Sequence, residues 1–239
     1  MEIGLRRAQI NALKASLPDL EPDLGPPRGS VELGEGYILL RAKDKAFHRI
    51  RDCETPIFHR FLCTVGYQLP FTEWIPKVTR WARLRLPNGQ IARSVWKEDT
   101  IILGNLRKFR MVKLRFPDSS VQFAEVKFYF MIKINDVVKA YALVVYFSDL
   151  DRELTVQTFN TLLVCRPLED TGLDIISVNT IQAVVGMLPL LLTLEEEAKE
   201  NSSPGRYTGL FFVAEKPGLE VFHLSGGDEE DNDTFHDSE

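Results

Sequence analysis

The segment VQFAEVKFYFMIKINDVVKAYALVVYFS, which runs from Val121 to Ser148, decides the fold. Between positions 124 and 134 every even residue is apolar while the charged residues occupy odd positions, and this period of two predicts a strand with one buried face. Residues 138–147 are apolar at almost every position and rich in aromatic and β-branched types, which predicts a return strand covered on both faces. Asn135 and Asp136 tolerate a positive φ, so the sequence predicts one long β-hairpin.

The overall composition is typical of a globular intracellular protein. The 239 residues, 44% of them hydrophobic and 10% aromatic, are sufficient for a packed core. The three cysteines form no CxxC pair, which predicts free thiols in a reducing compartment. The N-terminus is charged and amphipathic, and the longest apolar run, 184–194, is interrupted by Pro189 and too short to span a bilayer. We therefore expect a soluble protein without a signal peptide or a membrane segment.

Charge is distributed unevenly along the chain. The net charge is −5, yet residues 77–115 contain eleven basic and two acidic residues, a local balance of +9. The rest of the chain must then carry −14, and seven acids fall within the last twelve residues. Such asymmetry predicts a surface for nucleic acid or for another acidic partner, together with a solvated tail.

The chain divides into three parts by composition. Residues 1–30 are expected to form an amphipathic helix followed by a proline-rich linker. Residues 31–223 are expected to form a single β-rich domain, which contains a basic hairpin segment at 77–115 and the core hairpin at 121–148. Residues 224–239 form an acidic tail that we expect to be disordered.

The shorter elements of the domain are predicted from local patterns. Asn88-Gly89 predicts a two-residue hairpin turn, with Ala82, Leu84 and Leu86 facing inward. Residues 181–194 predict either a helix or a last barrel strand ending at Met187, and Pro189 limits both alternatives. The remaining expected elements are a helix at 57–65, an edge strand at 209–215, and strands near 31–44, 99–102, 109–116, 158–165 and 173–178.

The spacing of these elements favours one fold class. Short strands at turn-punctuated intervals, with few long helical patterns, predict a mainly β fold with peripheral helices and a small distorted β-barrel core. The sequence shows no βαβ pattern, which excludes most nucleotide-binding architectures.

Sequence motifs for catalysis are missing. The chain contains no GxxxxGK[ST], GxGxxG, GxSxG or HExxH pattern and only four histidines. Acid pairs such as Asp149 with Asp151, or Glu169 with Asp170, lie in expected loops without a third acid at defined spacing. We therefore expect no enzyme activity, no catalytic residues, no cofactor and no small-molecule substrate.

One group of residues has the chemistry of a zinc site. His48, Cys53, His59 and Cys63 fall within sixteen residues, and zinc accepts two thiolates and two imidazoles. Their spacing fits no standard zinc knuckle, however, so buried cysteines beside surface histidines are the favoured interpretation and no metal site is assigned. Cys165 lies within an apolar stretch and is predicted to be in the core.

The basic segment supplies the candidate binding residues. Arginine and lysine on neighbouring strands can neutralise phosphates, and arginine can pair with phosphate in a bidentate manner. Alternatively, these are ordinary outward residues of amphipathic strands, or they pair with the acidic tail. Trp81, Trp96 and Phe109 are compatible with base stacking, although core packing is favoured for each. The candidates are Arg83, Arg85, Arg93, Lys97, Arg107, Lys108, Arg110, Lys113 and Arg115.

The order of several segments resembles a family of mobile-element proteins. RWARLRLPNGQIARSVWKE, from Arg80 to Glu98, is followed by RKFRMVKLRF, AEVKFYFMI, KAYALVVYFS, FNTLLVC and LDIISVNTIQAVVGMLPL. This series, preceded by GYILLRAKD, resembles the C-terminal part of proteins encoded by Plavaka-type or related cut-and-paste transposons of basidiomycete fungi. The resemblance covers residues 36–190 and implies an accessory domain, because the nuclease acids of such proteins lie upstream of this region.

A more distant similarity concerns the arrangement of the strands. A charged strand, an aromatic hairpin with YALVVYFS, a strand like TLLVC and a final IxxVVGM strand are similar to bromo-adjacent homology domains of chromatin proteins. Those domains are small distorted barrels that bind histones or other proteins without catalysis, although residues 148–153 lack the proline and paired acids common there. The resemblances together imply a nuclear, non-catalytic module that engages DNA or an acidic chromatin partner. The alternative is a protein-interaction or structural remnant of a transposon protein that binds no nucleic acid.

Overall fold

The structure is a computed structural model that describes residues 25–67, 74–98, 109–134, 136–190, 207 and 209–215. Within these residues the chain is mainly β with helices at the periphery, as the sequence predicts. The expected N-terminal helix, most of the linker, the strand at 99–102 and the acidic tail lie outside the described residues.

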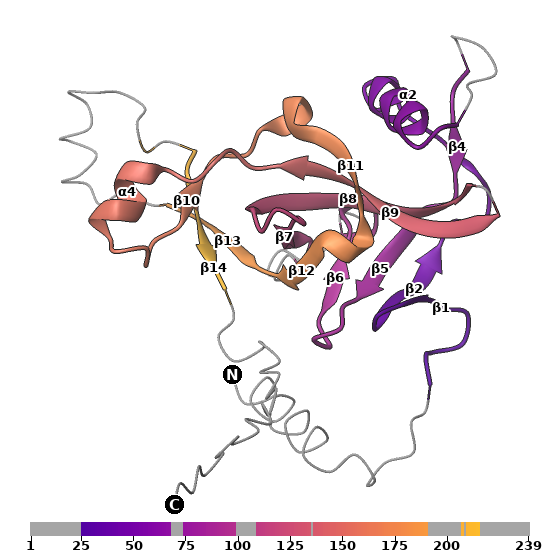
Figure 1. The fold of residues 1–239 in the computed structure, drawn as a ribbon, viewed down its shortest axis with the longest axis horizontal. Helices are drawn as coiled ribbons and strands as arrows, with labels where there is room; N and C mark the ends of the chain where they lie inside the picture. Colours follow the sequence, from indigo (N-terminus) through magenta and orange to yellow (C-terminus); the bar gives the residue numbers. More distant parts are fainter. Residues whose placement is uncertain are drawn as a thin grey trace, which may run out of the picture.

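The predicted core hairpin is present and contains the two longest strands (Figure 1). Strand β8 (Val121–Ile134) pairs with β9 (Val137–Tyr146) along its length, from Ala124 opposite Tyr146 to Ile134 opposite Val137. Asp136 in the turn adopts a φ of 64°, a conformation that aspartate tolerates better than most residues. The prediction of one long hairpin is confirmed.

In the described part of the chain, nine antiparallel strands, including the two of this hairpin, make up the main sheet. The outer edge of β9 pairs with β11 (Leu173–Ser177). The outer edge of β8 pairs first with β7 (Met111–Arg115) and further along with β5 (Trp81–Arg85). The remaining strands extend the sheet at its margins; they are β1 (Val31–Gly34), β2 (Tyr37–Lys43), β6 (Ile91–Arg93) and β12 (Ile181–Val184).

A β-bulge in β8 lies where its partner changes from β7 to β5. Val126 lies opposite Val144 and Phe128 opposite Leu143, so Lys127 is an extra residue without a partner in β9. An extra residue turns every following side chain to the other face of the sheet. The even residues therefore face one core before the bulge and the other core after it, and the prediction of a single buried face from 124 to 134 is wrong.

The two faces of the hairpin carry two separate apolar cores. The first core is enclosed by β2, β5, β7 and β12 and contains Leu39, Leu84, Leu114 and Tyr129, each fully buried. The second core lies on the opposite face. It includes Phe58, Phe130, Leu143, Leu173 and Ile175. From Ala140 onward β9 is covered on both sides, as predicted for the return strand, whereas Val138 and Lys139 at its start are exposed.

The described strands do not close into a barrel. No backbone ladder joins β6 to β12 among these residues, although the two strands lie near one another. The gap is bridged by side chains: the Gln90 amide donates to the Val184 carbonyl oxygen at 3.3 Å and accepts from the Val184 N–H at 2.8 Å. Asn88 also donates to the Gln182 carbonyl oxygen at 3.1 Å. The barrel core that the sequence predicts is therefore not confirmed.

The β5–β6 hairpin turns differently from the prediction. The Leu86 N–H donates to the Gln90 carbonyl oxygen, and the Gly89 N–H donates to the Leu86 carbonyl oxygen. The loop thus contains three residues instead of two, and Gly89 at a φ of 78° provides the left-handed position that this loop requires. The predicted inward residues Ala82, Leu84 and Leu86 are all buried.

A second, three-stranded sheet lies at the end of the molecule that carries helix α4 (Arg152–Gln157) (Figure 1). Its order is β10 (Val164–Cys165), β14 (Phe211–Ala214) and β13 (Gly186–Pro189). The strand expected at the edge, β14, is therefore central. Asp151 begins α4 by accepting the Leu154 N–H at 3.0 Å, where the sequence predicts only a polar connection.

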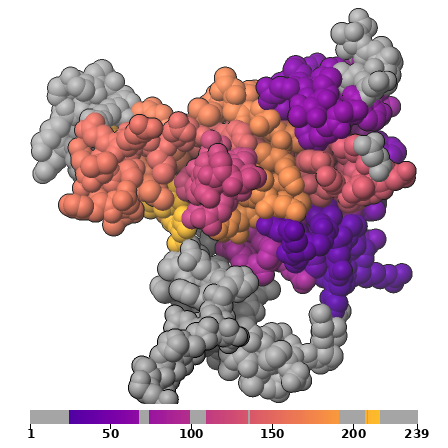
Figure 2. Space-filling model, in the orientation of Figure 1, coloured from indigo at the N-terminus to yellow at the C-terminus, as the bar shows by residue number. Residues whose placement is uncertain are grey.

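Helix α2 (Thr55–Thr64) confirms the helix predicted at 57–65 and covers the second core. Its Phe58 ring lies 5.1 Å from that of Phe130, and its Phe61 ring lies 4.7 Å from that of Tyr141. Figure 2 shows α2 and α4 at opposite ends of the molecule. The other elements are β3 (His48–Arg49), β4 (Lys77–Val78), α3 (Val95–Glu98) and two short 3-10 helices, Glu169–Gly172 and Val178–Thr180. Among the described residues no helix has the length and apolar character needed to cross a bilayer.

Candidate functional site

A groove of about 660 Å³ lies where β2 ends and the chain turns toward β3. Pairing between β2 and β5 brings this turn beside the basic hairpin, because Leu40 lies directly opposite Arg83. We call this site the basic groove; it is lined by Arg41, Ala42, Lys43, Asp44, Lys45, Ala46, Phe47, Thr79 and Arg83.

The basic groove carries four cations that lack acidic partners among the described residues. Arg41, Lys43, Lys45 and Arg83 are exposed, and none of them forms an ion pair with another described residue. The groove is therefore a concentrated positive surface that can attract anions.

The carboxylate in the lining, Asp44, is already neutralised. Its Oδ2 lies 2.9 Å from Nε of Arg80 and also accepts the Arg80 backbone N–H at 3.1 Å. Only 14% of the Asp44 side chain and 19% of the Arg80 side chain are exposed, so solvent screens this pair weakly. Asp44 consequently holds the turn in place without cancelling the four cations.

An aromatic ring stands among these cations. Phe47 is 74% exposed, so most of its ring is accessible to a ligand. The neighbouring tryptophan, Trp81, is only 2% exposed, and Nζ of Lys43 lies 5.3 Å from its ring centroid. Within the groove, Phe47 is therefore the ring available for stacking.

Two arginines extend the positive surface across the β5–β6 hairpin. Arg83 lies directly opposite Arg93, and like charges at such a position destabilise a sheet. The Arg93 guanidinium lies 5.2 Å from the ring centroid of Phe109, which is 37% exposed. The outward face of this hairpin thus continues the basic groove toward β7.

The nine basic residues predicted from the sequence fall into different surroundings. Arg83, Arg85 and Arg93 lie on the outward face of the β5–β6 hairpin, and Lys97 lies on α3 over the Trp96 ring. Arg115 is exposed at the end of β7, whereas Arg107 and Lys108 lie outside the described residues.

Arg110 and Lys113 are paired with described acids. Nε of Arg110 lies 2.7 Å from Oε1 of Glu125, and both side chains are mostly buried. Nζ of Lys113 lies 2.8 Å from Oε1 of Glu215. These two residues therefore contribute little free positive charge.

Sequence reasoning missed Arg41, Lys43, Lys45 and Phe47. The relevant signal is the run RAKDKAF at 41–47, in which three cations fall within five residues beside an aromatic residue. A charge count restricted to 77–115 omits this run, and only the β2–β5 pairing brings it beside Arg83.

The residues proposed as possible zinc ligands do not come together. Among the described residues, no three His, Cys, Asp or Glu side chains form a group that could hold a metal ion. A ring nitrogen of His59 lies 2.6 Å from the Trp74 carbonyl oxygen and is thereby engaged. Cys53 and Cys63 are exposed, so the expectation that they are buried is wrong.

The His48 ring and the Cys165 thiol are both uncharged near pH 7. Burial and the nearby Arg80 lower the pKa of His48, so its ring adds no charge beside the basic groove near pH 7. Burial raises the pKa of the Cys165 thiol to about 11, which keeps it protonated within the core, as its apolar surroundings predict.

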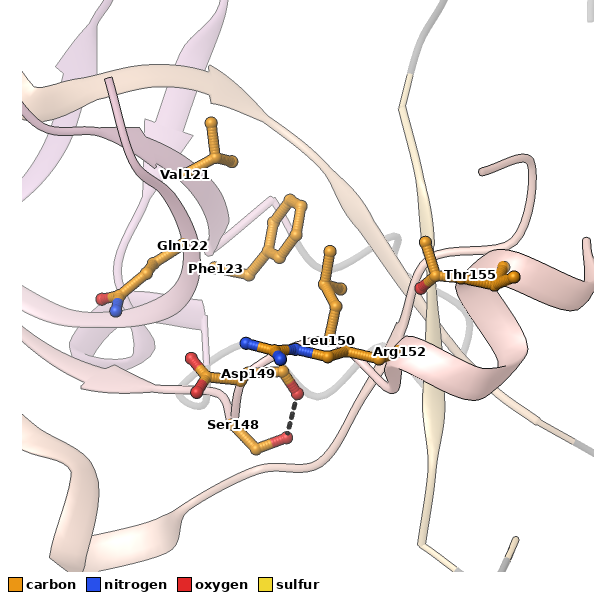
Figure 3. A pocket seen from close by; sticks show the side chains of 9 residues that line it. Val121, Gln122, Phe123, Ser148, Asp149, Leu150, Arg152 and Thr155 are labelled. Atoms are coloured by element: carbon orange, nitrogen blue, oxygen red, sulfur yellow. Dashed lines mark hydrogen bonds between the residues drawn. The ribbon is translucent and has the colours of Figure 1, made fainter. Parts of the chain in front are cut away.

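A second hollow of about 470 Å³ lies between the start of β8, the end of β9 and α4 (Figure 3). Ser148 donates from Oγ to the Asp149 carbonyl oxygen at 2.9 Å and accepts the Arg166 N–H at 3.0 Å. The lining contains neither histidine nor cysteine, and the Ser148 hydroxyl is already engaged with two backbone groups. Asp151 from the predicted acid pair caps α4 and is used structurally.

Compared with known proteins, the chain matches no family model, no curated protein and no solved structure. The resemblances to transposon-encoded proteins and to bromo-adjacent homology domains therefore remain predictions. Among the described residues, the basic groove combines four cations that have no acidic partner with one exposed ring, so it is a positively charged surface.

Proposed function

We propose that the protein is a non-catalytic module that binds nucleic acid through the basic groove. The observation that carries this proposal is a set of four cations around a groove whose carboxylate is paired with Arg80; within the part of the chain that the structure describes, none of the four has an acidic partner. Phosphodiester groups are the anions that such a surface meets in regular succession, and arginine and lysine are the side chains that most often contact them. As the sequence resemblance implies, we further propose that the protein binds DNA in the nucleus and derives from a fungal mobile element.

The Arg83–Arg93 pair supports an extended anionic ligand. These two residues repel each other across the β5–β6 ladder in the free protein. A phosphate bound between them would relieve this repulsion, whereas an uncharged ligand would not. A polyanion that follows the groove from residues 41–47 to β6 is therefore attracted by the groove cations and also relieves the repulsion between Arg83 and Arg93.

The number of cations sets the expected salt dependence. Four phosphate contacts on duplex DNA give a slope of about −3.6 in log affinity against log salt concentration. The affinity is then expected to fall about 150-fold between 50 and 200 mM salt. A slope near zero would contradict binding through phosphates.

The proposal is tested by measuring duplex binding with matched charge variants. A double variant, Lys45→Gln with Arg83→Gln, is expected to reduce affinity about tenfold and to reduce the salt slope by about 2. The control, Lys133→Gln with Lys139→Gln, removes the same charge from the tip of the core hairpin. Fluorescence anisotropy of a labelled 20-base-pair duplex gives both quantities. Equal loss in the two variants would show that net charge, and not the basic groove, determines binding.

A second candidate function rests on an apolar patch beside α4. Val156 is 73% exposed and Phe159 is 88% exposed. Phe159 and the following Asn160 adopt φ values of 52° and 60°, and a bulky residue rarely occupies this left-handed region. This arrangement supports the alternative prediction, a protein-interaction module. Self-association in analytical ultracentrifugation that is abolished by Phe159→Ser, with no DNA binding, would support it over the basic groove.

A further inference from the structure

We infer that the basic groove selects single-stranded over duplex nucleic acid, with the Phe47 ring stacking on an unpaired base. This inference rests on the proposed function and specifies the ligand of the same site. It depends on the position of one aromatic side chain and on the accessibility of the others.

Phe47 combines exposure with proximity to cations. It is 74% exposed and lines the same groove as Lys43, Lys45 and Arg83. Proteins that bind single strands combine cations that follow the backbone with rings on which bases stack. The basic groove contains both the cations and the aromatic ring within one turn of chain.

The geometry of a duplex prevents the same contact. In a duplex each base is stacked between its neighbours, so a side chain reaches a base face only by unstacking a step, which costs energy. An unpaired strand presents its base faces without that cost. A phosphate held by Lys45 or Arg83 would therefore leave a neighbouring base of a single strand free to stack on Phe47.

The other aromatic residues near the groove are engaged. Trp81 is buried in the first core. The Trp96 ring is covered by Arg80 at 4.6 Å and by Lys97 at 4.8 Å from its centroid. Phe109 contacts Arg93 and lies beyond the groove lining, where it can serve a longer strand. Base stacking within the groove consequently falls to Phe47.

The size of the groove is suited to a nucleotide. Its volume of about 660 Å³ lies within the range of 300–1,000 Å³ that is typical of small-ligand sites. It has room for a base together with its sugar and phosphate, and the open rim allows a strand to continue toward Arg93.

The experiment compares a labelled oligodeoxythymidylate of 20 nucleotides with a 20-base-pair duplex by fluorescence anisotropy at one salt concentration. The wild-type protein is expected to bind the single strand at least tenfold more tightly. Phe47→Ala is expected to weaken single-strand binding about 5- to 150-fold and to leave duplex binding unchanged. Phe47→Trp is expected to restore single-strand binding, with quenching of the new tryptophan on addition of the strand.

Phe159→Ala is the matched control, because Phe159 is even more exposed and follows α4, which lies at the opposite end of the molecule from β2 (Figure 1). It is expected to change neither affinity, and circular dichroism of each variant checks its folding. Equal affinities for single strand and duplex, or an unchanged single-strand affinity in Phe47→Ala, would overturn this inference. Either result would still be compatible with the proposed function if the Lys45 and Arg83 substitutions weakened binding to the duplex. If the wild-type protein bound neither the single strand nor the duplex, both this inference and the proposed function would be overturned.

Discussion

At the scale of single residues, two buried tyrosines illustrate how a hydroxyl group affects stability. The Tyr37 hydroxyl lies 3.1 Å from the carbonyl oxygens of both Asn179 and Ile181 and joins β2 to the chain entering β12. The Tyr129 hydroxyl is fully buried in the first core and has no hydrogen-bond partner among the described residues. Burial and the nearby Glu98 raise the pKa of Tyr129, so it is protonated at any ordinary pH.

The same chemical change should therefore have opposite effects at these two positions. Tyr129→Phe removes an unsatisfied polar group and is expected to raise the free energy of unfolding by about 1 kcal/mol. Tyr37→Phe removes a hydrogen-bonded hydroxyl and is expected to lower it by about 1 kcal/mol. Urea denaturation followed by circular dichroism measures both. A Tyr129→Phe variant as unstable as Tyr37→Phe would mean that the Tyr129 hydroxyl has a partner in solution.

At the scale of elements, the bulge at Lys127 determines which side chains enter which core. Val126 belongs to the first core, while Phe128 and Phe130 belong to the second. The bulge also marks the point at which β8 leaves β7 and meets β5 at Tyr129. Both cores and the divergence of the two neighbouring strands depend on this one extra residue.

Deleting Lys127 is expected to be far more damaging than truncating it. The deletion would turn residues 128–134 to the opposite face and exchange the contents of the two cores, costing about 3 kcal/mol or more. Lys127→Ala removes only its ion pair with Glu125 and is expected to cost about 1 kcal/mol or less. Thermal unfolding of the two variants gives the comparison. A deletion variant as stable as Lys127→Ala would show that β8 has no fixed register.

Much of this architecture follows from local patterns, while the rest depends on contacts between distant segments. Alternation and turn residues predict the core hairpin and the β5–β6 hairpin because the two strands of each hairpin are neighbours in sequence. The bulge has no such signal, since the even positions are apolar on both sides of Lys127 whichever core they face. The central place of β14 likewise depends on pairing with β10 and β13, which only the tertiary structure provides.

The candidate site likewise depends partly on local sequence patterns and partly on contacts between distant segments. The β5–β6 hairpin and its outward arginines are predicted from residues 80–98 alone. Arg41, Lys43, Lys45 and Phe47 join Arg83 only through the pairing of β2 with β5, across about forty residues of sequence. The partners that neutralise Arg110 and Lys113 are also distant in sequence, so a charge count along the chain includes cations that the fold has already paired.

At the scale of the whole molecule, a positive groove belongs to a protein of negative net charge. Residues 224–239, which lie outside the described residues, contain seven acids, and removing them changes the net charge from −5 to +2. Net charge acts on a charged ligand over a distance set by the salt concentration. The acidic segment is therefore expected to weaken binding to nucleic acid at low salt.

Deletion of residues 224–239 is expected to raise affinity for DNA about threefold or more at 50 mM salt, and the gain should vanish near 0.5 M salt. A chain that ends in a Gly/Ser segment of the same length separates the effect of charge from that of length. Anisotropy titrations at the two salt concentrations measure the effect. An unchanged affinity would mean that the acids do not influence the basic groove.

The most direct way to test whether nucleic acid binds in the basic groove is to locate the bound strand. The full chain is cross-linked to an oligodeoxythymidylate with ultraviolet light, and the linked peptides are identified by mass spectrometry. We predict cross-links within residues 41–47, centred on Phe47, and within the β5–β6 hairpin. Cross-links confined to α4 and the residues around Phe159, or distributed evenly over the surface, would contradict the account.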